Sequence, residues 1–259
     1  MMRWPRRPTV REGLVFFLSS GITAVLAWRW PLAVHATRYH YPEFLLSLLI
    51  CYFPVLAVHE GGHLVAARLV GFRPYAVACG PWRLDWSTHR IRLSMLPRTR
   101  WLSGSAASAP RDGRGLVWRT SLSAIGGGAA NILCAFLFLI LVTPVTPDGA
   151  KPLLVAWCIL SLVVGLINLL AIVPSGPGRI SDGKRLRLLW SRDGYALAAG
   201  WGISHLLNSG TRPRDLPPDL VAAARTLIGH GTTGWVGRMA AYGWALDRHD
   251  IQDADTALS

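Results

Sequence analysis

The stretch "AVHEGGHLVAARL", residues 57–69, places a carboxylate between two histidines at the end of the apolar run "FLLSLLICYFPVLAV". Its glutamate, Glu60, is one of only three in the chain. Ionisable groups are costly within a segment long enough to cross a bilayer, and by default they mark a functional site. The stretch therefore predicts a membrane helix that carries such a site.

The spacing of these groups is that of a zinc site on a helix. His59 and His63 lie four residues apart, so on a helix they project from one face, about 40° apart. Two neutral imidazoles in that position can bind a tetrahedral zinc ion. Glu60 lies about 100° further round, where it can reach a zinc-bound water. The pattern H-E-x-x-H thus favours a metal centre with Glu60 as general base over polar groups that only pack.

A third zinc ligand has to come from elsewhere, because a catalytic zinc usually has three protein ligands and one open position. We take Asp182, in "ISDGKRL", as this ligand, since it follows the last long apolar segment. His89 is the rival candidate, and an ordinary helix-start aspartate is the other interpretation of Asp182. Surface or packing positions are expected for the histidines of the more polar C-terminal region, His205, His230 and His249.

The composition is that of a membrane protein. Hydrophobic residues make up 51% of the 259 residues, charged residues only 16%, and the mean hydropathy is +0.33. A formal charge of +13 is also typical of nucleic-acid-binding proteins. No nucleic-acid-binding motif accompanies it, however, and much of the arginine flanks apolar segments. We therefore expect a lipid bilayer, and no nucleic acid, as a partner.

Four transmembrane helices are expected from the apolar segments, at about residues 14–34, 43–70, 119–142 and 153–173. Residues 1–13 are basic, and no small-residue cleavage site follows the first segment, which favours an uncleaved span over a signal peptide. The connection 71–118 carries eight arginines, against Arg38 and Lys151 in the loops expected on the other side. This asymmetry predicts a multi-pass protein of the cell membrane with both termini cytoplasmic.

The remaining regions are expected to be strands, linker and tail. Residues 72–96 alternate apolar and charged side chains around a turn at Gly80–Pro81, which predicts short β-strands. The composition of residues 103–115 is typical of a flexible linker. The fold class is therefore a mainly α polytopic membrane protein, with a membrane-embedded domain at 14–183 and a small helical cytoplasmic tail at 184–259.

Three motifs together resemble the site-2 protease family of intramembrane zinc metallopeptidases. The resemblance rests on "HEGGH" at 59–63, "GGGAAN" at 126–131, and Asn168 followed by "DG" at 182–183. It covers about residues 43–185. The chain has no loop long enough for a PDZ domain, so the resemblance implies a minimal form of the family.

The resemblance implies a role for each polar residue. The zinc ligands would be His59, His63 and Asp182, and the catalytic base would be Glu60. Asn131 and Asn168 would position the substrate or support the site. The β-like segment 72–96 would form a short re-entrant sheet after the second span, and its edge could pair with an extended substrate.

The chain also departs from the family's pattern. Gly128 stands where proline is usual, and the segment after Asn168 is "NLLA", with Pro174 arriving three residues late. Asp182 lies fourteen residues beyond Asn168, which is further than in many members. These departures affect the expected position of Asp182 more than that of the two histidines.

The sequence thus predicts an intramembrane zinc metalloprotease that cleaves a transmembrane or membrane-associated protein or peptide, with Glu60 activating a zinc-bound water. The main alternative is an inactive membrane module of the same fold that binds a partner through its tail. A transporter with an intramembrane metal site is a second, although the internal repeats expected of one are missing. A soluble zinc peptidase is a third, and the span lengths and arginine asymmetry argue against it.

Overall fold

The computed structural model describes residues 41–87, 90–142, 146–170, 180–227 and 231–258. Within these ranges the chain is mainly helical and contains one small sheet. Several predictions fall outside the described residues: the basic N-terminus 1–13, the first span 14–34, the rival ligand His89, and His230.

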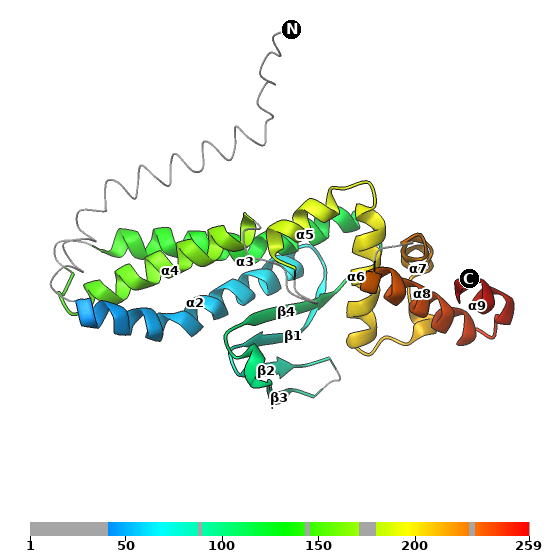
Figure 1. The fold of residues 1–259 in the computed structure, drawn as a ribbon, viewed down its shortest axis with the longest axis horizontal. Helices are drawn as coiled ribbons and strands as arrows, with labels where there is room; N and C mark the ends of the chain where they lie inside the picture. Colours follow the sequence, from blue (N-terminus) through cyan, green and yellow to red (C-terminus); the bar gives the residue numbers. More distant parts are fainter. Residues whose placement is uncertain (1–40, 88–89, 143–145, 171–179, 228–230, 259) are drawn as a thin grey trace, which may run out of the picture.

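Three long helices lie side by side in Figure 1: α2 (Tyr41–Leu69), α3 (Leu116–Leu141) and α4 (Lys151–Leu169). All three are long and apolar enough to cross a membrane. Only 28–33% of the residues in their most apolar windows are buried, and Leu49 and Leu133 are more than 70% exposed. Apolar surface of this extent is unusual in water, so it supports a membrane location. The second, third and fourth predicted spans correspond to these helices.

Helices α2 and α3 pack closely because glycines face each other. A Cβ atom on Gly62 would collide with the backbone of Gly126, and a Cβ atom on Gly126 would collide with Gly62 and Ala66. Gly61, by contrast, faces open space. Small residues at such a crossing let two helix backbones approach within a membrane. This contact holds the histidine-bearing part of α2 against α3.

The sheet has four antiparallel strands in the order β3-β2-β1-β4. The strands are β1 (Arg73–Cys79), β2 (Trp82–Asp85), β3 (Arg92–Met95) and β4 (Gly104–Ala109). A tight turn joins β1 to β2 through Gly80, whose φ of +59° suits glycine. The strands predicted within 72–96 are therefore present.

Strand β4 corrects the prediction that residues 103–115 are a flexible linker. Ser105 pairs with Ala78 and Gly104 with Cys79, so β4 is a full member of the sheet. The sequence "GSAASA" offers no large apolar side chains to signal a strand. The strand forms because its backbone pairs with β1, and its small side chains let the end of α2 lie against it.

Five shorter helices follow, and α6 to α9 gather at one end of the molecule (Figure 1). They are α5 (Asp182–Leu189), α6 (Gly194–Asn208), α7 (Pro218–Arg225), α8 (Gly231–Leu246) and α9 (Ile251–Leu258); single 3₁₀ turns lie at Arg98–Arg100 and Pro213–Asp215. One hydrophobic core joins Ala67, Phe72 and Leu116 to Ile203 and Leu220. Helices from the region after residue 184 thus share one core with α2, α3 and the sheet, although the sequence suggested a separate tail there.

Candidate metal centre

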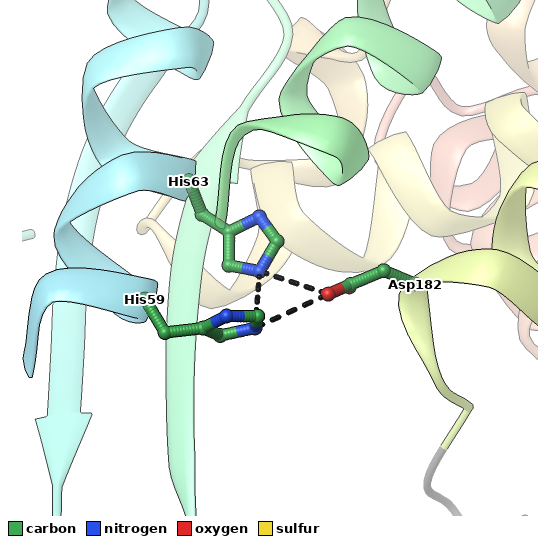
Figure 2. A group of neighbouring side chains, drawn as sticks. All are labelled: His59, His63 and Asp182. Atoms are coloured by element: carbon green, nitrogen blue, oxygen red, sulfur yellow. Dashed lines mark hydrogen bonds and ion pairs between the residues drawn. The ribbon is translucent and has the colours of Figure 1, made fainter. Parts of the chain in front are cut away.

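Three potential ligand atoms converge between α2 and the start of α5. His59 Nε2 and His63 Nε2 are 3.2 Å apart, and each lies 3.2 Å from Asp182 Oδ2 (Figure 2). Both His59 and Asp182 are buried, with 4% and 8% exposure. The structure therefore brings together the two histidines and the aspartate singled out in the sequence, and this group could hold a metal ion.

The dimensions of this triangle fit a small tetrahedral ion. Two ligand atoms that each lie about 2.0 Å from a tetrahedral zinc are about 3.3 Å from each other. The observed separations are all 3.2 Å. Asp182 Oδ2 is also fully buried and accepts no hydrogen bond of acceptable geometry from the described residues. A buried carboxylate oxygen with its lone pairs facing two imidazole nitrogens is suited to a cation.

Local structure at the start of α5 leaves the Asp182 carboxylate available. Ser181 occupies the N-cap position, and its hydroxyl accepts a hydrogen bond of 3.4 Å from the backbone N–H of Lys184. Asp182 is therefore not the capping residue, although it does lie in the first turn of α5, where a negative charge complements the helix dipole. Burial on its own raises the pKa of a carboxyl, but the two adjacent imidazoles outweigh it and lower the pKa of Asp182. The group is thus ionised, as a metal ligand must be.

The ring of His63 is oriented from behind by α3. Its Nδ1 lies 2.8 Å from the carbonyl oxygen of Ser123. The backbone N–H of Gly127 is more distant, at 3.3 Å, so we take the shorter contact as the one that sets the tautomer. With Nδ1–H donated to Ser123, Nε2 is left as the nitrogen that can bind a metal. Gly127 is needed here because a Cβ atom would collide with this ring.

The ring of His59 has a comparable support. Its Nδ1 lies 3.2 Å from the side-chain nitrogen of Asn131, whose oxygen is buried and has no partner in the described part of the chain. Exchanging the amide nitrogen and oxygen, which have nearly the same shape, would let the amide oxygen accept from His59 Nδ1–H. Nε2 would then be free to bind a metal. Asn131 is fully buried, so this geometry favours a supporting role over direct contact with substrate.

Glu60 is placed beside the triangle but outside it. It is 5% exposed and lines the same cavity as His59, His63 and Asp182. Its carboxylate packs against Gly104 of β4, where a Cβ atom would collide with it. The glycine therefore positions Glu60 from the sheet side, a contact for which the sequence gives no signal.

The cavity that contains the candidate metal centre has a volume of about 610 Å³. Its walls come from α2, α3, the sheet, α5 and α6. Asn168 also lines it, but the Asn168 amide donates to the carbonyl of Val164 in its own helix, at 2.9 Å. Its predicted substrate-positioning role stays a prediction. The cavity is also lined by Arg185 and Trp201, which the sequence did not single out. His205, expected to be a surface or packing residue, lines it as well.

Comparison with protein-family models, with curated proteins and with solved structures finds no match to this chain.

Proposed function

We propose that the chain is an intramembrane zinc metalloprotease of the site-2 protease type. The single observation that carries the proposal is the buried triangle of His59, His63 and Asp182, with sides of 3.2 Å and a carboxylate beside it. Its position at the inner end of an apolar helix supports hydrolysis within or beside a membrane. The proposed cofactor is one zinc ion.

In the proposed reaction, a water molecule attacks the carbonyl carbon of a substrate peptide bond. Zinc, when bound, lowers the pKa of water toward about 7 and polarises the carbonyl. Glu60 accepts a proton from the water as the new C–O bond forms. It then transfers that proton to the amine nitrogen as the C–N bond breaks.

The substrate would bind in an extended form along β4. A transmembrane helix hides its peptide bonds in internal hydrogen bonds, so a segment must unwind before it can be cut. Strand β4 is an edge of the sheet and contacts Glu60 through Gly104. Edge strands add extended peptides through backbone hydrogen bonds. In this proposal the sheet is re-entrant, and β4 replaces the 72–96 strands as the pairing edge.

The proposed topology has four spans in the cell membrane and cytoplasmic termini. Arginine density between α2 and α3 supports a cytoplasmic position for that connection, because positive charge is retained on the inner side. The partners would be the bilayer and a transmembrane or membrane-associated protein or peptide.

The test is cleavage by purified protein reconstituted in liposomes with a panel of single-span membrane peptides. We expect wild-type protein with zinc to cut at least one peptide. Glu60→Gln should lower the rate by about a hundred- to ten-thousandfold. The variant should retain zinc, because Glu60 is outside the ligand triangle.

Two outcomes would contradict the proposal. Cleavage that persists in Glu60→Gln removes the assigned base. Zinc-loaded wild-type protein that cuts no member of the panel, and captures none in the Glu60→Gln form, favours the inactive membrane module instead.

A further inference from the structure

We propose that the guanidinium of Arg185 binds a carboxylate of the substrate, in the same cavity as the candidate metal centre. This inference rests on the proposed function and adds a substrate class to it. The class comprises peptides that carry an acidic side chain, or a free C-terminal carboxylate, close to the bond that is cut.

The position of Arg185 follows from the helix that carries Asp182. The two residues are three apart on α5, so they project from neighbouring positions on one face. Both line the cavity that also contains Glu60 and His63. A group bound to Arg185 would therefore lie in the same chamber as the reacting peptide bond.

The guanidinium is held in place and forms no ion pair among the described residues, although it is close enough to Glu60 for their charges to interact. Its central carbon lies 5.6 Å from the ring centroid of Trp201, in a cation–π contact from α6. Arg185 Nε is buried and has no hydrogen-bond partner among the described residues. A buried N–H group without a partner costs free energy, and guanidinium is well shaped to bind a carboxylate through two parallel hydrogen bonds. A substrate carboxylate would supply the missing partner.

The wall around Arg185 adds no competing charge. His205 Nδ1 and Tyr75 Oη are 2.9 Å apart. Burial, helped by the charge of Arg185, lowers the pKa of His205 to about 4, and burial raises the pKa of Tyr75 to about 12. Both are therefore neutral at pH 7, and the positive charge of this wall belongs to Arg185.

The rest of the cavity lining is consistent with an acidic ligand. Among the described residues, the carboxylates that line it are Glu60 and Asp182, and both have roles in the proposed chemistry. Arg83 also lines the cavity, but it is paired with Asp85 at 3.0 Å. Arg100 lines the cavity as well, but it is exposed, whereas Arg185 has a buried Nε and an aromatic support. Among the cations that line the described part of the cavity, Arg185 is thus the one held in place without an ion pair.

The experiment measures peptide binding to the full-length Glu60→Gln protein in detergent micelles. Fluorescein-labelled decapeptides carry a single glutamate at each position in turn, and each is compared with its glutamine counterpart by fluorescence anisotropy. A further pair compares a free C-terminus with an amide. We expect the carboxylate member of at least one pair to bind about tenfold more tightly. The pair that shows the preference distinguishes an acidic side chain from a C-terminus.

Arg185→Gln should abolish this preference. The matched control is Lys184→Gln, which removes an exposed positive charge from the adjacent position of the same helix and should leave the preference intact. No preference in any pair, or a preference unchanged by Arg185→Gln, would overturn the inference. So would a preference that disappears when a chelator removes metal but survives Arg185→Gln.

The two proposals fail in different ways. Wild-type cleavage without a carboxylate preference contradicts only the role of Arg185. A preference that depends on Arg185, in a protein whose wild-type form cuts nothing, contradicts the proposed hydrolysis.

Discussion

Asn131 contributes to the candidate metal centre without facing the cavity. It is fully buried behind His59, whereas Asn168 bonds a carbonyl of its own helix. In the sequence the two asparagines look alike, since each is a polar residue within an apolar segment. Which one supports a ligand depends on which helix face packs against α2, and a single sequence does not contain that information.

Replacing Asn131 by leucine should weaken zinc binding by about ten- to a hundredfold, because the ring of His59 would lose its supporting hydrogen bond. Asn168→Leu is the control and should leave zinc affinity unchanged. Affinity can be measured by competition with a chromophoric chelator. Equal affinities for wild type and Asn131→Leu would show that the amide does not orient His59.

The grouping of the three potential ligands could be predicted where residue spacing determines the geometry. His59 and His63 follow from the helical period, and Asp182 follows from the break after the last apolar segment. The Ser123 carbonyl and Gly104 were not predictable, because a backbone oxygen and a missing side chain have no distinctive signal. They became visible only when α3 and β4 were placed beside α2.

At the scale of elements, the predicted helices and the strands from 73 to 95 follow from their hydrophobic patterns, whereas β4 does not. Its Gly, Ser and Ala residues indicate a linker by local propensity. Pairing with β1 overrides that propensity. The missed strand is the one next to Glu60, so local composition failed at the element that we propose as the substrate-binding edge.

The contact between α2 and α3 gives an element-scale prediction. Gly62→Val should destabilise the protein by about 1–3 kcal/mol, because the added side chain collides with the backbone of Gly126. Gly61→Val is a matched control, since Gly61 faces open space. Thermal unfolding in detergent should give a lower midpoint for Gly62→Val only. A similar loss in both variants would point to helix propensity as the cause.

Across the whole molecule, one core joins the end of α2, the sheet and helices α6 and α7. The sequence indicated a separate tail because residues 184–259 are more polar than the spans. Polar residues, however, indicate that a segment contacts water; they do not indicate that the segment folds as a separate domain. The packing of α6 over the cavity is what brings Trp201 and His205 to the site.

This packing predicts a pH dependence of stability. Because the pKa of His205 is lowered from 6.5 to about 4, the unfolded chain binds a proton at a higher pH than the folded protein does. Stability from this group is therefore complete above about pH 6.5 and is lost as the pH falls toward 4. The thermal midpoint of wild type should decline over that window more steeply than that of His205→Gln. Parallel curves for the two proteins would contradict the assignment.

The central claim is that His59, His63 and Asp182 together hold one zinc ion. The most direct measurement is the zinc content of the purified chain, obtained by mass spectrometry at neutral pH without chelators. We predict close to one zinc per chain in wild type and in Glu60→Gln, and nearly none in His63→Ala and Asp182→Ala. A wild-type chain without zinc, or an Asp182→Ala variant that binds zinc as tightly as wild type, would contradict the account.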